Sequence, residues 1–295
     1  MSRWEFQIVD VFTDLPLAGN QLAVFPDATS IPEKMLHPLA REINFSETVF
    51  LYPPEAGGAA KMRIFTPGGE IPFAGHPVLG TAVYLAQQQR SQAIDLETNG
   101  GRVAVRYVGG TGPAKRGIMR QPIPSIEPFA QPVPFLAALG IADSLLPVTL
   151  YDNGLRHVYF MVKDPDAVAA LAPDSGALLR AAEHLDLPFI GVNVFSGEGT
   201  QWKTRMFAPG AGVIEDPATG SAAGPLALHL ARNGLIPWGQ EIQISQGAEL
   251  GRPSTLFARV SGSANVIESV EVGGDAILVG GGWFHAEILE QFGLS

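Results

Sequence analysis

One short motif occurs twice in this chain, and each copy leads into a segment that is apolar on nearly every side. The run RIFTPG at residues 63–68 recurs as RMFAPG at residues 205–210, and after three inserted residues EIPFAGH is echoed by EDPATGS. The apolar segment after each copy contains a single polar side chain, Thr81 in the first and His229 in the second. A helix without a polar face must be buried on all sides. We therefore expect two pseudo-symmetric halves, each a curled, mostly antiparallel sheet around one central buried helix. Chance or shared turn chemistry is the alternative explanation of so short a match.

The remaining pattern is that of a strand-rich chain of the α/β (α+β) class. The 34 glycines and 24 prolines are spread without a period, which favours many tight turns. Ser30-Ile-Pro-Glu33 has the form of a capping box with a proline just inside the helix, so we expect a helix from there to about Ile43. Short or alternating apolar runs predict strands at residues 6–12, 22–25, 47–52 and 62–66.

The length of the chain, 295 residues, fits two domains better than one or three. The best candidate boundary is the Gly- and Pro-rich region at residues 109–134. We therefore expect an N-terminal half at residues 1–120 and a C-terminal half at residues 121–295, with the last strand free to return to the first half.

Charge and composition exclude several classes of partner and site. The formal net charge is −10, and a negative field repels phosphate backbones and anionic lipid, so neither nucleic acid nor a membrane is an expected partner. The chain has no cysteine, which excludes disulfides, zinc–thiolate sites and a cysteine nucleophile or proton carrier. It shows no signal-peptide pattern and no apolar run of about 18 residues, so we expect a soluble, cytoplasmic protein.

Both copies of the motif bring a glycine and a polar side chain to the start of a buried helix. Gly75 precedes His76, which we place at the N-cap before Pro77, and Gly220 precedes Ser221 at the matching cap. Free N–H groups and the positive end of the helix dipole make each terminus an anion site. If the halves pair by pseudo-symmetry, the two termini face each other across a cleft that fits a small carboxylate. The alternative is that Ser221 merely caps its helix and His76 packs beside a turn.

Two acids lie near these helix starts in the sequence. Asp216 precedes the second helix, and Glu47 lies at a helix-to-strand junction. A partly buried carboxylate at such a junction has a raised pKa and suits proton transfer at neutral pH. The alternative for each is a solvated or capping acid.

Other chemical motifs are missing from the sequence. It contains no dinucleotide-binding loop, P-loop, HExxH or GxSxG motif, and GGTG at residues 109–112 is interpreted as a turn. The six histidines show no metal-ligand spacing. His229 is interpreted as a core histidine, and His157 has no mechanism derivable from the sequence. We therefore expect neither a metal nor an organic cofactor.

At these motifs the chain resembles the PhzF family of phenazine biosynthesis, which shares the diaminopimelate epimerase fold. The combination of the glutamate at position 47 with Gly-His-Pro and Asp-x-Ala-Thr-Gly-Ser is highly specific for the family. The resemblance spans most of the chain and is carried by Gly19-Asn20 with Ala23-Val-Phe25, Asn44-Phe-Ser-Glu47-Thr, Ile64 to Thr81, Asn153-Gly-Leu-Arg-His157, Arg205 to Pro225, His229 to Arg232, Gln246-Gly247 and Gly251 to Ser254.

The resemblance implies a homodimer of two-domain chains with the active site in the cleft between the halves. It implies a cofactor-free isomerase that moves a proton from C3 to C1 of trans-2,3-dihydro-3-hydroxyanthranilate. Glu47 would carry the proton, while His76 and Asp216 would hold or polarise the substrate, with Asp216 near its amino group. The residues implied to line the substrate site are Asn20, Ser46, Gly75, Gly220 and Ser221.

The chain departs from the phenazine enzymes at two positions, with Gln21 where they carry proline and Thr48 where serine is common. Related epimerases of this fold use a cysteine pair, which a chain without cysteine cannot do. Two alternatives therefore stay open beside the lead hypothesis. One is a related isomerase or epimerase for another small carboxylate or amino acid, and the other is a non-catalytic protein that binds a small carboxylate.

Overall fold

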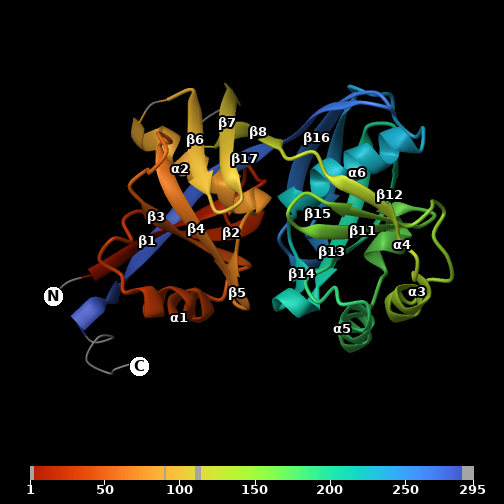
Figure 1. Ribbon diagram of the computed structural model, residues 1–295, viewed down its shortest axis with the longest axis horizontal. Helices are drawn as coiled ribbons and strands as arrows, with labels where there is room; N and C mark the ends of the chain where they lie inside the picture. Colours follow the sequence, from red (N-terminus) through yellow and green to blue (C-terminus); the bar gives the residue numbers. More distant parts are fainter. Residues whose placement is uncertain (1–2, 90, 110–113, 288–295) are drawn as a thin grey trace. The chain divides into compact units, whose positions relative to one another are not determined.

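The structure is a computed structural model that describes the chain over residues 3–89, 91–109 and 114–287. These residues belong to two compact units (Figure 1). Unit 1 consists of Met1–Met119 with Gly274–Ser295, and unit 2 consists of Arg120–Gly273. The segment from Gly274 onward, part of the expected C-terminal half, thus belongs to unit 1. Of the turn expected at residues 109–112, residues 110–112 lie outside the described ranges.

Unit 1 is built on a mixed sheet. Its strands are β1 (Arg3–Val11), β2 (Asn20–Phe25), β3 (Glu47–Tyr52), β4 (Ala60–Thr66), β5 (Gly69–Ile71), β6 (Ala93–Thr98), β7 (Gly101–Gly109), the first part of β8 (Lys115–Gln121) and the last part of β17 (Ile267–His285). Two pairs are parallel, β2–β3 and β4–β6, and a helix lies in each connection, α1 (Glu33–Ile43) and α2 (Gly75–Gln89). The pairs β1–β17, β1–β2, β3–β4, β4–β5, β6–β7 and β7–β8 are antiparallel.

The two helices of unit 1 cover opposite faces of this sheet. Side chains alternate between the faces of a strand, and one face packs against α1 through an aromatic cluster that includes Phe25, Phe50 and Phe65. The other face packs against α2, in which all residues from Gly75 to Val83 are buried. A Cβ at Gly80 would lie 2.6 Å from Val11, so glycine is needed for this close approach.

The strands expected in this part of the chain are confirmed as β1 to β4, with β1, β2 and β4 each beginning two or three residues earlier than expected. The expected capping box is wrong. Helix α1 begins at Glu33 with Pro32 as its N-cap and no side-chain cap. The residue before a proline is disfavoured in the α region, so Ile31 cannot belong to the helix and Ser30 lies too far from it to cap it. The expected end at Ile43 is confirmed.

Unit 2 is also built on a mixed sheet. Its strands are β9 (Ser125–Pro128), β10 (Thr149–Asp152), β11 (Arg156–Met161), β12 (Gly191–Glu198), β13 (Gln201–Ala208), β14 (Val213–Asp216), β15 (Glu241–Gln246), β16 (Ser254–Gly262) and the first part of β17. Its helices are α3 (Val133–Leu139), α4 (Pro165–Ala169), α5 (Ser175–His184) and α6 (Gly220–Arg232), with 3₁₀ turns η1 (Pro209–Ala211) and η2 (Ala248–Leu250). The pairs β11–β12 and β13–β15 are parallel.

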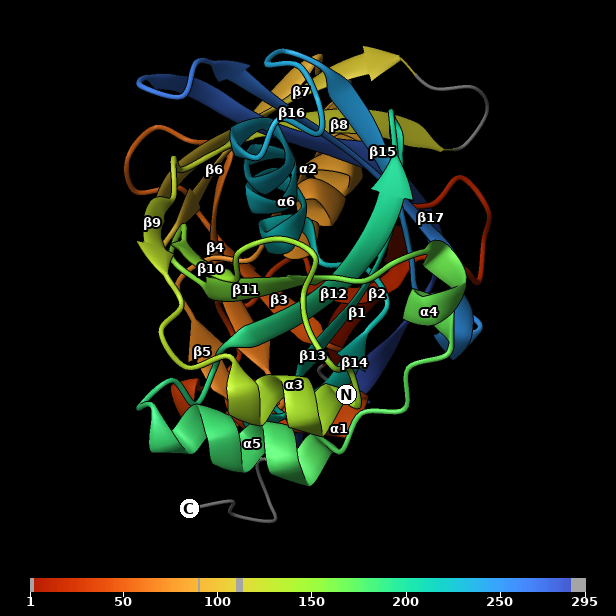
Figure 2. The ribbon, with the colours of Figure 1, turned by 90° about the vertical axis from the view of Figure 1, so that its right-hand side faces the viewer.

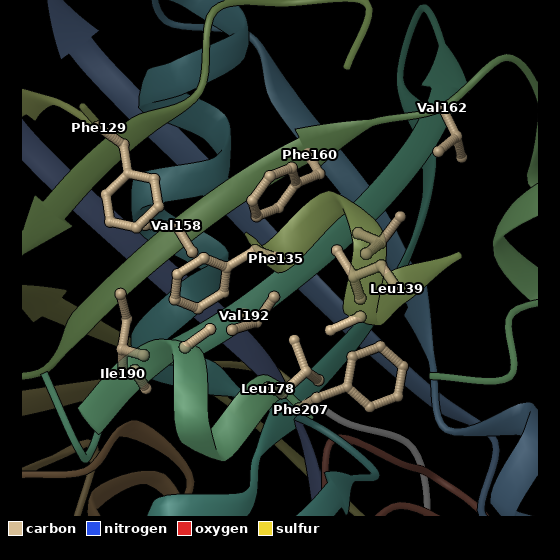
Figure 3. Packing of buried hydrophobic residues seen from close by; sticks show 14 of the residues in the cluster. Phe129, Phe135, Leu139, Val158, Phe160, Val162, Leu178, Ile190, Val192 and Phe207 are labelled. Atoms are coloured by element: carbon tan, nitrogen blue, oxygen red, sulfur yellow. The ribbon is translucent and has the colours of Figure 1, made fainter. Parts of the chain in front are cut away.

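Helix α6 is the buried helix of unit 2. Every residue from Gly220 to Ala231 is buried, and α6 lies alongside β11 and β16 (Figure 2). Helices α3 and α5 lie side by side and pack on a separate apolar cluster, in which Phe135 and Leu178 meet Phe160 of β11 and Val192 of β12 (Figure 3). Strands β11 and β12 are therefore buried on both faces.

The repeated motif occupies the same elements in both units. Each copy runs from a long strand through a short strand into the buried helix, as β4–β5–α2 in unit 1 and β13–β14–α6 in unit 2. The ion pairs also match: Nε and Nη2 of Arg63 donate to Glu70 at 2.7 Å each, and those of Arg205 donate to Glu215 at 2.8 and 2.7 Å. The match therefore extends well beyond turn chemistry.

Candidate functional site

Glu47 opens β3 on the face that packs against α2. The alternation of the strand puts Glu47 with Val49 and Leu51, opposite Phe50, which belongs to the cluster under α1. Asn20 of β2 faces the same way, because Leu22, two residues on, lies next to Gly80 of α2. The strand pleat thus aims both side chains at the helix that carries His76.

His76 meets these two side chains inside unit 1. Its Nδ1 atom lies 3.3 Å from Asn20 Nδ2 and 3.2 Å from Glu47 Oε2. The imidazole is buried, whereas 15% of the Glu47 side chain is exposed. Burial lowers the pKa of His76 to about 3, against a hydrogen bond to the Gln21 backbone that raises it. His76 is therefore a neutral imidazole at physiological pH.

The start of α2 differs from the expectation in detail. Gly75 is the first helical residue and His76 the second, so His76 is not the N-cap and Pro77 is not the first residue. The Nε2 atom of His76 is buried without a hydrogen-bond partner among the residues of the described ranges. Ser46 directly precedes β3 and is partly buried. Thr48 is fully buried and points away from Glu47, toward the opposite face.

Asp216 is anchored by a small polar network in unit 2. The Thr219 hydroxyl donates to Asp216 Oδ2 at 2.6 Å and accepts from Gln246 Nε2 at 3.0 Å. Gln246 also donates to the Asp216 carbonyl at 2.8 Å and accepts from the Thr219 N–H at 3.1 Å. All three side chains are buried. The carboxylate of Asp216 is thus held in one orientation beside the start of α6.

Ser221 does not cap α6. The helix begins at Gly220, its N-cap is Thr219 without a side-chain cap bond, and Ser221 is the second helical residue. The Ser221 hydroxyl instead lies 3.1 Å from Nε2 of His157, a residue of β11 that is buried like Ser221 itself. The placement of Ser221 at the N-cap, which the lead and the alternative interpretation share, is therefore wrong.

The predicted site residues thus form two groups, one in each unit. Unit 1 brings together Glu47, His76 and Asn20 around the start of α2, with Ser46 and Gly75 adjacent in the chain. Unit 2 places Asp216, Gly220 and Ser221 at the start of α6. The interpretation of His229 as a core histidine is confirmed. It is fully buried, and its Nδ1 lies 3.1 Å from the Tyr151 hydroxyl, whereas its Nε2 finds no hydrogen-bond partner among the described residues.

The comparison with protein families decides the assignment. The family model PhzC-PhzF, described as "Phenazine biosynthesis-like protein", matches residues 9–282. The chain belongs to the PhzC-PhzF family. It is 44% identical over 277 residues to the trans-2,3-dihydro-3-hydroxyanthranilate isomerase of Pseudomonas fluorescens, covering 94% of this chain and 98% of that protein. The corresponding isomerase of Pseudomonas aeruginosa is 45% identical over 270 residues, covering 92% and 95%.

Solved structures share the fold. A PhzF-family protein of Bacillus anthracis superposes with a TM-score of 0.84 at 23% identity, covering 97% of this chain and all of that chain. A hydroxyproline epimerase of Agrobacterium vitis superposes with a TM-score of 0.63 at 13% identity, covering 96% and 91%. This family member therefore has the mixed α/β fold that PhzF proteins share with such epimerases.

Sequence reasoning missed several polar residues of this PhzC-PhzF chain that hold the start of α6. Each makes a side-chain hydrogen bond to the first residues of α6 or to Asp216, and they are Gln121, Asn153, His157, Tyr159 and Gln246. The runs containing Asn153, His157 and Gln246 are part of the family resemblance, but sequence spacing gives no sign of which helix they contact.

The described ranges contain no group of three or more His, Asp or Glu side chains arranged to hold a metal ion. None of the helices within those ranges is long and apolar enough to cross a membrane.

Proposed function

We propose that this PhzC-PhzF protein is a cofactor-independent isomerase that acts on trans-2,3-dihydro-3-hydroxyanthranilate. The proposal is supported by the similarity to isomerases named for that substrate along nearly the whole chain. The structural observation that carries it is the partly exposed carboxylate of Glu47 beside the neutral imidazole of His76. A carboxylate next to a neutral, buried polar group is suited to accept and return a proton.

In the proposed reaction Glu47 takes the proton from C3 of the ring and returns it at C1. The C3–H bond breaks, the ring double bonds shift and a C1–H bond forms. The enol produced at C3 then becomes a ketone as it loses its hydroxyl proton and C4 gains a proton. Carboxylate and substrate exchange one proton, and no electrons leave the substrate. The reaction therefore needs no redox partner, and one general acid–base serves both steps.

Positioning of the substrate is assigned to the remaining site residues. The backbone N–H groups of Gly75, His76, Gly220 and Ser221 lie in the first turns of α2 and α6, where helices attract anions. We assign the substrate carboxylate to such a helix start, with the Ser221 hydroxyl, and the substrate amino group to Asp216. We assign Asn20 and Ser46 to the lining of the site. That the groups in both units bind one substrate stays a prediction.

The unpartnered Nε2 atom of His76 supports a ligand at α2. Buried polar atoms are nearly always hydrogen-bonded in proteins, and this one, like Nε2 of the core residue His229, finds no partner among the described residues. Unlike His229, His76 lies beside the partly exposed carboxylate of Glu47. A substrate oxygen or amino group would satisfy it. His76 is therefore assigned to holding the substrate against Glu47.

The test is turnover of the named substrate by the purified chain in deuterated water. We expect disappearance of the substrate absorbance and, by NMR, solvent deuterium at C1 in part of the product. The fraction depends on how well the closed site excludes exchange. Binding without turnover would favour a carboxylate-binding protein. If the protein neither binds the substrate nor turns it over, the result would favour an isomerase of another small carboxylate or amino acid.

We also propose that the chain forms a homodimer, as the resemblance to the family implies. Light scattering coupled to size-exclusion chromatography measures the mass directly. A mass equal to that of one chain at micromolar concentration would overturn this part of the proposal.

A further inference from the structure

Two residues of the β10–β11 hairpin hold Ser221 from the side. Asn153 Nδ2 donates to the Ser221 carbonyl at 2.9 Å, and His157 Nε2 lies 3.1 Å from the Ser221 hydroxyl. The carbonyl needs this donor because its usual partner in a helix is the N–H four residues on, and that residue is Pro225. Asn153 thus replaces the hydrogen bond that Pro225 cannot make, and the hairpin holds Ser221 at both its carbonyl and its hydroxyl.

The proton on His157 is placed by Asn193. The side-chain amide nitrogen of Asn193 donates to the carbonyls of Val158 and Gly191, at 3.2 Å each, which fixes the orientation of that amide. The same nitrogen faces His157 Nδ1 at 3.5 Å. A protonated Nδ1 would set two N–H donors against one another. This arrangement favours the neutral tautomer that carries its proton on Nε2 and donates it to Ser221.

A proton on Nε2 of His157 argues against a serine nucleophile site made of Ser221, His157 and Asn193. In a serine nucleophile site the histidine accepts the serine proton at Nε2 and keeps its own proton on Nδ1. With the proton on Nε2, as this arrangement favours, His157 cannot act as that base. The Ser221 oxygen instead accepts from His157, and its own proton is left to be donated to a ligand.

The repeat also relates Gly191 of unit 2, next to His157, to the proposed proton carrier Glu47 of unit 1. Thr48 pairs with Phe65, and Val192 pairs with Phe207 at the matching place of the repeat. Glu47 therefore corresponds to Gly191. A Cβ at Gly191 would lie 2.4 Å from His157 Nδ1, so the His157 ring fills the space that a side chain would need. Unit 1 therefore has the acid Glu47 at this position, whereas the glycine in unit 2 leaves space for the ring of His157.

We infer that His157 is a positioning residue that holds the Ser221 hydroxyl as a hydrogen-bond donor to the carboxylate of the bound ligand. The inference rests on the proposed function, because that function supplies the carboxylate. It assigns a role to the Asn153–His157 run, for which the sequence suggests no mechanism. His157 itself does not touch the ligand and moves no proton during the reaction.

The first test is the protonation of His157 in the free protein. Long-range proton–nitrogen NMR on the full chain labelled at histidine nitrogen distinguishes the two neutral forms, and His157→Gln identifies the signal. We expect a proton on Nε2 and none on Nδ1. A proton on Nδ1 would overturn the inference whatever the protein's substrate is.

The second test compares two ligands that differ only in the carboxylate. The probes are 3-hydroxyanthranilate, an aromatic analogue of the proposed substrate, and 2-aminophenol, which lacks the carboxylate. Removing one hydrogen bond to a charged group, in Ser221→Ala, should weaken binding of 3-hydroxyanthranilate about tenfold or more and leave 2-aminophenol unchanged. His157→Leu should give a similar pattern, whereas His157→Gln, whose amide can donate from nearly the same place, should retain most of the affinity.

A double-mutant cycle separates positioning from a general structural effect. In the Ser221→Ala background, His157→Leu should add little further loss, because the hydroxyl that it orients is gone. Additive losses, or equal losses for both probes, would overturn the inference. If His157→Leu does not fold, Gly191→Ala displaces the ring in an otherwise unchanged chain and should show the same selective loss.

Failure of the proposed function gives a different result. If the wild type does not bind 3-hydroxyanthranilate or turn over the substrate, the proposed function fails and the carboxylate-donor role fails with it. If the wild type binds and turns over normally while all His157 variants match it, the function stands and the inference alone is wrong.

Discussion

The Nδ1 atom of His76 lies 3.2 Å from a carboxylate oxygen of Glu47, and the imidazole of this pair is neutral. The contact is therefore between a carboxylate and a polar group, not between two full charges. A neutral amide in place of the carboxylate keeps the shape and most of the surroundings of the pair.

Glu47→Gln should for this reason fold and bind ligand normally but lose turnover. A lost general acid–base costs roughly 10²–10⁴-fold in rate, and we expect a loss of at least that size in kcat with little change in affinity for 3-hydroxyanthranilate. Steady-state kinetics and calorimetry measure the two effects. Glu5→Gln, on an exposed position of β1, is the matched control. Near wild-type turnover in a folded Glu47→Gln protein would mean that another residue carries the proton.

Thr219→Val tests the network that orients Asp216. The substitution removes the hydroxyl that donates to Asp216 at 2.6 Å, and one hydrogen bond to a charged group is worth about 1.5–3 kcal/mol. We expect a higher KM, by about tenfold, with a smaller change in kcat. Thr200→Val, in the exposed turn between β12 and β13, should change neither. An unchanged KM in Thr219→Val would show that Asp216 needs no such support.

The buried histidines should make the protein less stable in acid. Burial lowers the pKa of His229 to about 4, below its value of about 6.5 in an unfolded chain. The unfolded state therefore binds more protons between these values, and the free energy of unfolding falls as the pH drops below about 6.5. Each such group contributes at most about 1.4 kcal/mol per pH unit, and the pKa values of His76 and His157 are lowered in the same direction.

Urea denaturation at about pH 7.5, 6.5 and 5.5 measures how the free energy of unfolding depends on pH. These values roughly span the range in which the histidine of the unfolded chain titrates. His229→Gln should be less stable at neutral pH, because it loses packing against Tyr159, but its stability should fall less steeply with acid. His184→Gln, on an exposed position of α5, should keep the wild-type slope. An identical slope in His229→Gln would argue against the lowered pKa.

The repeated ion pair offers a comparison within one chain. Arg205 is buried, with Nε and Nη2 on Glu215 and Nη1 donating to the Leu171 carbonyl at 2.7 Å. Lysine has one charged nitrogen and cannot make these contacts together. Breaking a buried pair costs about 3–5 kcal/mol, so Arg205→Lys should lower the free energy of unfolding by about 2–4 kcal/mol.

Arg63→Lys is the matched substitution in unit 1. Arg63 is more exposed than Arg205, and one of its two acidic partners, Glu33, lies largely in solvent. Its loss should cost about 1 kcal/mol, since exposed pairs contribute little. If both variants lose the same free energy of unfolding, burial does not make the Arg205 ion pair more stabilising than the Arg63 ion pair. Chemical denaturation followed by circular dichroism provides the measurement.

Much of the local structure follows from the sequence alone. The absence of polar residues around two segments predicts α2 and α6 as buried helices, because no helix face remains for solvent. The strands β1 to β4 follow from their apolar patterns, and the family follows from the motifs around Glu47, His76 and Asp216. The predicted starts of α1, α2 and α6 each differ from the observed ones by two residues. Pro32 and the turn before Gly220 set the first residue of α1 and α6 through backbone geometry rather than through a side-chain cap.

The contacts that give the site its chemistry depend on tertiary structure. His157 and Ser221 are 64 residues apart, and only the pleat of β11 against α6 turns the imidazole toward the hydroxyl. The choice of tautomer depends on Asn193 in a third element, and the neutral state of His76 depends on burial that no local pattern records. The sequence determined which segments must be buried and which residue types were present, because hydrophobic periodicity and motif chemistry are local. Tertiary structure decided which polar groups meet and which of them carry protons, because hydrogen bonding and desolvation are set by neighbours that lie far away in the chain.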